Sequence, residues 1–362
     1  MHYGMGGFVM KRLLQIPEYV EDVNRVVSLA FPWEKLRGKT ILITGGTGLI
    51  GSFLIDVLAA AKLDCKVLLF GRSESKARQR FAEYWDEGWL GFVKWDAIDT
   101  RSLMVNGMEI DYVVHLASNT HPVAYATDPI GTITTNVIAL NNLLALASEK
   151  RVTRFLFASS NEIYGENRGD VELFDEKYCG YIDCNTLRAG YPESKRCGEA
   201  LCQAYVRQRG LDCVIARLTR TYGPTALPTD TKAISQFFSN ALKEEDIVLK
   251  SDGKQYYSYQ YVADSVSGLM TILLEGEAGA AYNIADESGD ITLRDLAALI
   301  AKQAGRKVVF DIPNGVESAG FSRATKARLD GRKLRALGWT PYYDIDQGVI
   351  RNYEIAVSHG MF

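Results

Sequence analysis

The chain alternates short runs of apolar, β-branched residues with longer stretches in which apolar residues recur at helical spacing. The strand-like runs include TILIT (40–44), KVLLF (66–70), DYVVHLA (111–117), RFLFASS (154–160) and DCVIARL (212–218). The helix-like stretches include SFLIDVLAAA (52–61), NVIALNNLLALASE (136–149) and roughly residues 192–208. Strands that alternate with helices predict a parallel sheet covered on both faces. We therefore expect an α/β fold built on a doubly wound parallel sheet.

The chain contains no internal repeat or low-complexity linker, so we expect any second lobe to be woven into the sheet domain. From the N-terminus, we predict a helical lead-in (1–38), a sheet domain (39–221 and 255–285), a smaller C-terminal substrate lobe (222–254 and 286–345) and a tail (346–362). The segment 255–285 is expected to return to the large sheet.

A glycine-rich turn, TGGTGLIG (44–51), joins the first predicted strand to the following helix. Gly46, Gly48 and Gly51 have the spacing G-x-G-x-x-G, and Gly45, Gly48 and Gly51 have the wider spacing G-x-x-G-x-x-G. Glycines allow a tight turn and let backbone approach a pyrophosphate at the helix N-terminus. Between a strand and a helix, the motif indicates a Rossmann-type dinucleotide site rather than a merely structural turn.

The residues after the second predicted strand bear on the choice of cofactor. Gly71, Arg72 and Ser73 lie where an acid would bind the ribose hydroxyls. Arg72 could pair with a 2′-phosphate, which favours NADP over NAD, or it could belong to a solvated helix start. Asp96 could bind the adenine amine or cap a turn. The predicted cofactor contacts are Gly45, Gly46, Gly48, Leu49, Ile50, Gly51, Arg72, Ser73, Asp96, Ala97, Leu116, Ala117, Tyr191 and Lys195.

The segment GYPESKR contains a candidate base. If a helix begins near Pro192, Tyr191 and Lys195 lie on one face of it. A phenol has an ordinary pKa near 10, so its ionisation at neutral pH costs about 4 kcal/mol. A nearby ammonium and a cationic nicotinamide ring would lower that cost. Y-x-x-x-K alone is common on helix surfaces, but FASSNEIYG also places Ser159 and Ser160 at the end of a predicted strand.

The glycine turn, the strand-end serine and Y-x-x-x-K, in this order, resemble the extended short-chain dehydrogenase/reductase family, specifically its nucleotide-sugar epimerase, dehydratase and decarboxylase branch. The segments DYVVHLAS, RLTRTYGP, QYVADSV and LGWTP, and Asn136 after GTITT, follow in the same order. The resemblance implies an NAD(P)-dependent enzyme that oxidises C4 of a nucleoside-diphosphate sugar to a ketone. It assigns Ser160 to the reacting hydroxyl, Tyr191 to its proton, and Lys195 to the nicotinamide ribose and to Tyr191.

Glu162 bears on the reaction that follows oxidation. In family members with T-D-E or T-S-E here, the third residue acts in water elimination or lies beside a sugar acid that is decarboxylated. This chain reads Ser160, Asn161, Glu162. Side chains two residues apart on an extended strand point to the same side, so Glu162 is expected to face the sugar as a catalytic residue. Asn161 cannot donate the aspartate's proton, which weakens the dehydratase interpretation, and Glu162 could also be a structural turn residue.

Two positions depart from the pattern of the family. Arg220 replaces the asparagine usual in RLTRTYGP, and Tyr257 replaces the arginine usual in GKQYYSYQYV, which normally contacts the diphosphate. Arg220 could take over that contact or bind a glucuronate carboxylate. It could also be a buried arginine paired with a structural acid such as Asp264. The predicted substrate-binding residues are Asn161, Arg220, Lys232 and Tyr257.

A UDP-glucuronate-type decarboxylase is the first hypothesis, because Glu162 and YPESKR most resemble that subgroup and Arg220 offers a partner for a carboxylate. A nucleoside-diphosphate-sugar 4-epimerase, a 4,6-dehydratase and a simple NADPH-consuming reductase remain alternatives. A non-catalytic NAD(P)-sensing protein is a more distant one, because it would have no need of Ser160, Tyr191 and Lys195 together.

Composition supports a small-molecule enzyme. Of 362 residues, 47% are hydrophobic and 23% charged, and the net charge of -3 gives no electrostatic reason to expect nucleic acid or a membrane as partner. Residues 1–12 do not resemble a signal peptide, and no apolar run approaches the roughly 20 residues of a membrane span, so we expect a cytoplasmic protein. Six cysteines without a CxxC pair indicate neither a disulfide framework nor a metal site.

The helices expected at 136–150 and 192–208 carry more apolar residues than one core face requires. Family members often pair through these two helices, so the resemblance implies a homodimer. Alternatively, the extra apolar residues pack beneath the smaller lobe. The residues in question are Leu140, Leu143, Leu144, Cys197, Leu201 and Tyr205.

Overall fold

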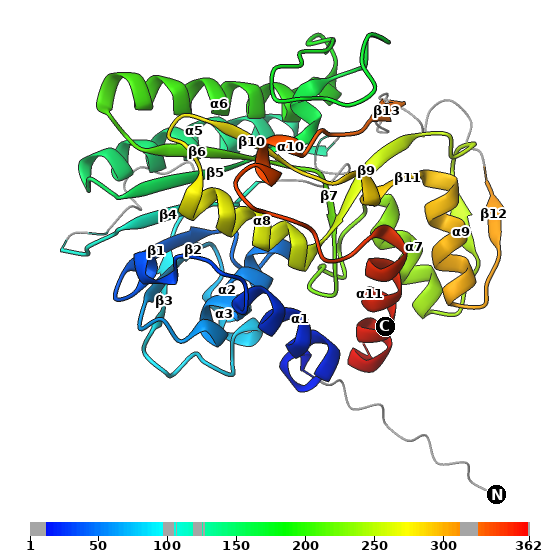
Figure 1. The fold of residues 1–362 in the computed structure, drawn as a ribbon, viewed down its shortest axis with the longest axis horizontal. Coiled ribbons are helices and arrows are strands. Elements are labelled where there is room, and N and C mark those ends of the chain that lie inside the picture. Colours follow the sequence, from blue (N-terminus) through cyan, green and yellow to red (C-terminus); the bar gives the residue numbers. More distant parts are fainter. Residues whose placement is uncertain are drawn as a thin grey trace, which may run out of the picture.

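A seven-stranded parallel sheet forms the centre of the molecule (Figure 1), which is a computed structural model that describes residues 12–96, 105, 107–118, 125, 127–311 and 325–360. The strand order is β10-β6-β5-β4-β1-β2-β3. These strands are β1 (Thr40–Thr44), β2 (Lys66–Gly71), β3 (Leu90–Lys94), β4 (Tyr112–His115), β5 (Arg154–Ser160), β6 (Cys213–Leu218) and β10 (Ala281–Ile284). The direction of winding reverses between β1 and β4, where the carboxyl ends of the strands form a ligand-binding crevice.

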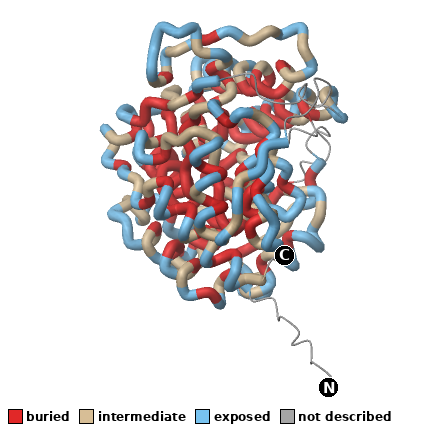
Figure 2. The backbone as a smooth tube through the Cα atoms, turned by 90° about the vertical axis from the view of Figure 1, so that its right-hand side faces the viewer, coloured by how far each residue is buried: buried red, intermediate tan, exposed pale blue. Residues whose placement is uncertain are grey.

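Helices cover both faces of this sheet (Figure 1), which explains why its strands are almost continuously apolar. One face carries α5 (Pro129–Glu149) and α6 (Gly190–Arg209), and the other carries α2 (Leu49–Ala61), α3 (Glu74–Arg80) and α8 (Val262–Glu275). Buried residues fill the interior of the molecule, and exposed residues surround them (Figure 2). The predicted doubly wound α/β fold is therefore confirmed.

Helix α5 is long and apolar enough to cross a membrane, but half of its most apolar window is buried inside the protein. Leu140, Leu143 and Leu144 are fully buried against the sheet, in one cluster with Phe155 and Phe157 of β5. Its hydrophobicity is therefore explained in large part by the core of this domain.

In the described residues, the smaller lobe contains two short sheets and three helices. One sheet contains β7 (Arg220–Tyr222), β9 (Tyr256–Tyr261), β11 (Asp290–Thr292) and β13 (Lys326–Ala327), and the other pairs β8 (Ile247–Leu249) with β12 (Val308–Phe310). The helices are α7 (Ala233–Leu242), α9 (Leu293–Gln303) and α11 (Ile345–His359). The short helix α10 (Arg332–Arg335) instead lies against β10 and α8.

Two segments differ from the expected division. Within 255–285, β9 pairs with β7, β11 and β13 of the lobe, and only α8 and β10 return to the large sheet. Residues 345–359 form helix α11, which buries Val349 and Ile355, so this part of the expected tail belongs to the core. The capping box formed by Asp344 and Gln347 starts this helix.

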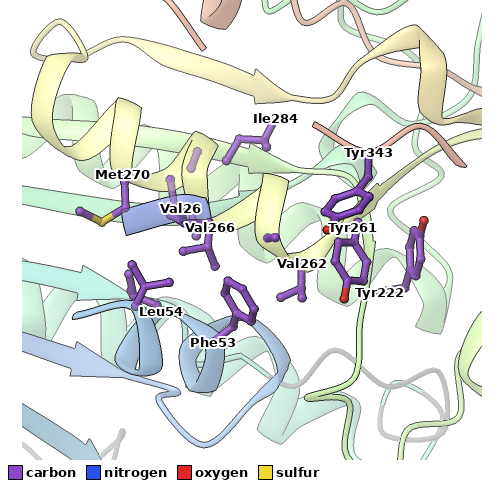
Figure 3. Close-up of a cluster of buried hydrophobic side chains, with 14 of the residues drawn as sticks. Val26, Phe53, Leu54, Tyr222, Tyr261, Val262, Val266, Met270, Ile284 and Tyr343 are labelled. Carbon is purple, nitrogen blue, oxygen red and sulfur yellow. The ribbon is translucent and has the colours of Figure 1, made fainter. Parts of the chain in front are cut away.

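Helix α1 (Pro17–Val27) connects the large sheet to the smaller lobe. The carboxylate of Asp22 is fully buried and accepts hydrogen bonds from the hydroxyl of Tyr261 at 2.7 Å and from Nε of Arg351 at 2.9 Å. Val26 lies in one apolar cluster with Phe53 of α2 and Val266 of α8 (Figure 3). The predicted helical lead-in therefore lies against both parts of the chain.

Candidate active site

The glycine turn lies between the end of β1 and the start of α2, where the packing leaves no space for larger residues. Gly45 has a φ of +72°, and a Cβ atom there would lie 2.7 Å from the backbone nitrogen of Ala117. A Cβ on Gly51 would lie 2.4 Å from the carbonyl oxygen of Gly45. Gly48 precedes α2, so the backbone N–H groups of Leu49 and Ile50 begin the helix without a side-chain cap.

This turn fits the diphosphate of a dinucleotide, because uncapped amides at a helix N-terminus bind anions. The loop after β4, with Leu116 and Ala117, packs directly against Gly45. Six of the predicted cofactor residues (Gly45, Gly46, Gly48, Leu49, Ile50 and Gly51) thus come together at the carboxyl ends of β1 and β4.

The predicted adenosine contacts lie at the same edge of the sheet, after β2 and β3. Arg72 is exposed, and Ser73 caps α3 by accepting a hydrogen bond from the backbone N–H of Lys76 at 3.3 Å. Asp96 is exposed two residues after β3. Ala97 lies outside the described residues. Because β2 and β3 follow β1 in the sheet, Arg72 and Asp96 lie on the side of the glycine turn where the adenosine would bind.

The three predicted catalytic groups Ser160, Tyr191 and Lys195 come together at the carboxyl end of β5. Helix α6 begins at Gly190, two residues before the expected start, and buries both Tyr191 and Lys195. Nζ of Lys195 donates to the carbonyl oxygen of Ala158 at 2.8 Å and lies 5.9 Å from the centroid of the Tyr191 ring. The fold therefore brings a hydroxyl, a phenol and an ammonium to one place.

The groups around Tyr191 raise its pKa overall, whereas we expected the ammonium of Lys195 to lower it. Burial has the largest effect, and the negative charge of Glu162 adds to it. Hydrogen bonds with Ser160 and Ser118 and the charge of Arg188 act in the opposite direction. Burial also lowers the pKa of Lys195 to about 8, so this ammonium is itself desolvated.

A chain of hydrogen bonds behind Tyr191 was missed by sequence reasoning. Ser118 donates to Oδ1 of Asn136 at 2.7 Å, and Nδ2 of Asn136 donates to Ser194 at 2.8 Å. Ser194 in turn donates to the carbonyl oxygen of Tyr191 at 2.7 Å. These residues hold the first turn of α6 against α5. The available signal was Asn136 itself, a buried amide in an otherwise apolar helix.

The structure separates the roles of the two serines. Ser159 donates to Oε1 of Glu199 at 2.5 Å, and Glu199 forms an ion pair with Arg217 at 2.7 Å. Successive side chains of a strand point to opposite faces, so Ser160 faces Tyr191 instead. Ser160, rather than Ser159, is therefore the serine of the site, as its assigned role requires.

Glu162 does not continue the strand, contrary to the expectation. β5 ends at Ser160, whose Oγ accepts a hydrogen bond from the N–H of Glu162 at 3.2 Å and caps a 3-10 helix, η4 (Asn161–Tyr164). Nη2 of Arg188 lies 2.7 Å from each carboxylate oxygen of Glu162. Glu162 nevertheless affects the pKa of Tyr191, so the turn keeps its charge at the site.

Arg188 and Tyr125 are two further residues that sequence reasoning missed. Arg188 lies on η5 (Leu187–Ala189), and its guanidinium is 4.8 Å from the centroid of the Tyr125 ring. The Tyr125 ring stacks on Tyr191 with their centroids 4.9 Å apart. No local pattern marks either residue, because both reach the site through packing between segments.

The predicted substrate-binding residues lie on the smaller lobe and on η4. The guanidinium of Arg220 on β7 stacks on the ring of Tyr257 on β9, 3.4 Å from its centroid. Within the described part of the chain, Nη1 of Arg220 is buried without a hydrogen-bond partner. Asp264 instead accepts hydrogen bonds from the backbone N–H groups of Tyr342 and Tyr343. The ion pair with Asp264 that we considered is therefore not the observed arrangement.

The other two predicted substrate-binding residues, Lys232 and Asn161, already have partners or are buried. Nζ of Lys232 binds Oδ2 of Asp230 at 2.9 Å, and Asn161 is buried at the start of η4. Asn161 lies next to Ser160 and Glu162, whereas Lys232 precedes α7 in the smaller lobe.

Known proteins share both the sequence and the fold of this chain. The NAD dependent epimerase/dehydratase family matches residues 41–285. UDP-glucuronic acid decarboxylase 1 of Xenopus tropicalis is 31% identical over 92% of this chain and 76% of its own length. UDP-glucuronic acid decarboxylase 6 of Arabidopsis thaliana is 33% identical over 85% of this chain and 86% of its own. DesIV, a dTDP-glucose 4,6-dehydratase of Streptomyces venezuelae solved with NAD bound, has a TM-score of 0.76 and 26% identity over 87% of this chain and 96% of that one.

The match spans the glycine turn, Ser160, Tyr191 and Lys195, and extends to β10 at the edge of the large sheet. The chain therefore belongs to the NAD dependent epimerase/dehydratase family.

Proposed function

We propose that this sugar-nucleotide-modifying enzyme is a UDP-glucuronate decarboxylase. The observation that carries the proposal is the ion pair of Glu162 with Arg188 beside Tyr191, with Asn161 in place of an acid. A 4,6-dehydratase must protonate a departing hydroxyl, whereas loss of carbon dioxide from a keto acid needs no such donor. The two decarboxylase relatives support the same choice.

The first step is oxidation at C4 of the sugar. Ser160 hydrogen-bonds the C4 hydroxyl, and Tyr191 takes its proton as general base. A dinucleotide held by the glycine turn would supply the hydride acceptor for this oxidation and the hydride donor for the later reduction. Lys195, buried behind Tyr191, favours the phenolate by its positive charge.

The second step breaks the bond between C5 and the carboxylate carbon. With a ketone at C4, the electron pair of that bond moves toward O4, and carbon dioxide leaves. In this proposal, Ser160 and Tyr191 hydrogen-bond O4 as its negative charge develops. A proton from water then adds to C5, and reduction at C4, with the proton returned to O4 by Tyr191, completes a UDP-pentose. Glu162, paired as a carboxylate, accepts hydrogen bonds from the sugar hydroxyls and orients the ring.

The products of the purified protein test the proposal. Incubated with NAD or NADP, the enzyme is expected to convert UDP-glucuronate to a product lighter by one carbon dioxide, without net consumption of cofactor. Mass spectrometry measures the product, with UDP-glucose, dTDP-glucose and GDP-mannose as comparison substrates. Loss of water would establish a dehydratase instead, an unchanged mass with a new sugar an epimerase, and stoichiometric loss of NADPH a reductase.

Arg220 is the residue that we propose for the diphosphate of the substrate. Its guanidinium lies over Tyr257, which occupies the position of the family's usual arginine. β7 and β9 are paired neighbours, so a cation on β7 can serve the same region as one on β9. A guanidinium with an unpaired buried N–H group is suited to a phosphate oxygen.

Arg72 underlies our proposal that the enzyme prefers NADP. Substitution Arg72→Ala is expected to weaken NADP binding about tenfold and to leave NAD binding nearly unchanged, because only NADP carries the 2′-phosphate. Calorimetric titration with each dinucleotide measures both affinities. Arg78→Ala serves as the control, because Arg78 is also exposed but lies on α3, after the predicted cofactor contacts Arg72 and Ser73. Equal losses for NAD and NADP in Arg72→Ala would contradict the preference.

The exposed faces of α5 and α6 underlie our proposal of a homodimer. Leu140, Leu143 and Leu144, which we had considered for this interface, are buried in the chain's own core against the sheet rather than beneath the smaller lobe. Ile133 and Ile138 of α5, which are 42% and 40% exposed, remain available for a second copy. We expect sedimentation as a dimer at micromolar concentration, and as a monomer for Ile138→Asp. A monomeric unsubstituted protein would exclude this interface.

A further inference from the structure

We propose that Arg188 is a positioning residue that allows the carboxylate of Glu162 and an ionised Tyr191 to stand side by side. This inference rests on the proposed function, since it explains how the same site can hold a base for C4 and a second negative charge beside the sugar. It concerns a residue outside both sequence motifs of the site, since Arg188 lies on η5, between η4 and α6.

Three contacts fix the position of the guanidinium. Nη2 of Arg188 lies 2.7 Å from both carboxylate oxygens of Glu162. Cζ of Arg188 lies over the Tyr125 ring, 4.8 Å from its centroid, and Tyr125 stacks on Tyr191. The cation therefore stands between Glu162 on one side and the aromatic stack that contains the base on the other.

Stabilisation of the fold alone does not explain the buried guanidinium of Arg188. Nε and Nη1 of Arg188 are buried and, among the described residues, have no hydrogen-bond partner. Buried donors that lack partners destabilise a fold, and a buried ion pair is seldom a net source of stability. The incompletely satisfied guanidinium instead keeps a positive potential inside the site, where two negative charges need it.

The charges around Tyr191 act in the directions that this role requires. Burial and then the charge of Glu162 raise the pKa of Tyr191, whereas the charge of Arg188 lowers it. Burial, the largest single effect, tends to lower the pKa of Arg188, but the charge and hydrogen bonds of Glu162 together with the charges of Tyr125 and Tyr191 outweigh it. The pKa is therefore raised and the guanidinium keeps its proton. The other groups that face Tyr191 and Tyr125 are Ser118, Ser160, Lys195 and Asp230.

In an alternative role, Arg188 binds the carboxylate of the substrate directly. In that case, loss of the guanidinium would weaken substrate binding and raise KM, and the ionisation of Tyr191 in the substrate-free enzyme would not change. In the role proposed here, the ionisation of Tyr191 changes before any substrate is added. The two roles therefore separate in the NAD-bound enzyme.

Four variants divide the contributions. Arg188→Met removes the charge at similar length, and Arg188→Lys keeps the charge but loses the planar stack. The double variant Arg188→Met with Glu162→Gln removes both members of the ion pair. Arg154→Met is the matched control, because Arg154 is also half-buried and binds Asp212 through two nitrogens, but at the opposite end of β5.

The measurement is the tyrosinate absorbance of the NAD-bound enzyme as a function of pH, taken as the difference from Tyr191→Phe. We expect Arg188→Met to raise the apparent pKa of Tyr191 by about one to two units, so that kcat at neutral pH falls about 10- to 100-fold and recovers as the pH rises. Arg188→Lys is expected to restore most of the titration, and the double variant to reverse most of the shift, because it also removes the repelling carboxylate.

An unchanged titration in Arg188→Met would overturn the proposal, and a raised KM with that unchanged titration would assign Arg188 to the substrate. An equal shift in Arg154→Met would also overturn it, because the effect would then not be specific to the site. The titration needs no sugar nucleotide. A normal shift together with no release of carbon dioxide from UDP-glucuronate would therefore reject the decarboxylase reaction but retain the role of Arg188.

Discussion

Turnover is expected to fall by about a hundredfold to ten-thousandfold when Tyr191 is replaced with phenylalanine, because the substitution removes the group that takes the C4 proton. The hydroxyl is buried and interacts with Ser160 and Ser118, so little space is left for a water molecule to replace it as base. The ring itself remains and keeps its stacking on Tyr125. Affinity for the dinucleotide should therefore change by less than about threefold.

Product formation by mass spectrometry and cofactor binding by calorimetry measure the two halves of this prediction. Tyr205→Phe is the matched control, since Tyr205 also lies on α6 but its hydroxyl binds Asn141 on the helix surface. Turnover of Tyr205→Phe should remain close to that of the unsubstituted enzyme. Retention of full activity by Tyr191→Phe would exclude Tyr191 as the base and with it the oxidation step proposed above.

Gly45→Ala is expected to cause the largest loss of cofactor binding, about a hundredfold or more, together with a lower thermal stability. Two causes combine at this position. A φ of +72° strains any residue other than glycine, and the new Cβ would lie 2.7 Å from the backbone nitrogen of Ala117. Backbone cannot move aside as a flexible side chain can, so the turn must shift away from the geometry that its amides need to hold a diphosphate.

Gly88 provides the control that separates these two causes. Its φ is +80°, but a Cβ there would meet nothing within 4 Å. Gly88→Ala should therefore show only the backbone strain, about 1 kcal/mol of lost stability, with unchanged affinity for the dinucleotide. If Gly45→Ala bound NAD or NADP as tightly as Gly88→Ala does, the glycine turn would not be the diphosphate site.

The features that the sequence predicted correctly are those encoded over short distances along the chain. Short apolar runs and helical spacing of apolar residues identified β1, β2, β4, β5 and β6 and the main helices of the large sheet, and the glycine spacing located the turn between β1 and α2. Ser160, Tyr191 and Lys195 lie where the sequence placed them, at the end of a strand and on the first turns of a helix, while their catalytic roles, which the family resemblance supplied, stay predictions. Such patterns result from backbone geometry, which neighbouring residues alone determine.

The assignment of segments to lobes was less accurate. β9 is almost as buried as a strand of the large sheet, yet it pairs with β7, β11 and β13. These partners come from parts of the chain that the sequence pattern does not relate to β9. Helix α11 was expected as a tail, since its burial depends on a surface formed by other elements.

The orientation of the Glu162 side chain and its ion pair with Arg188 could not be predicted from the residues next to either of them in sequence. The strand ends at Ser160, as its apolar run predicts, but Ser160 also caps η4, so Glu162 lies in a turn and not on an extended strand. Arg188 then reaches Glu162 across 26 positions of sequence, and Arg220 reaches Tyr257 between two paired strands.

Local sequence patterns thus predicted the order of strands and helices along the chain and the position of the glycine turn, and the resemblance of the motif order to a known family pointed to Tyr191 as the base. Charge pairing, stacking and the pKa of Tyr191 were decided only by the folded structure. The physical reason is that burial and Coulomb interactions depend on distances of a few ångströms between residues that are remote in sequence, and those distances exist only after the elements have packed.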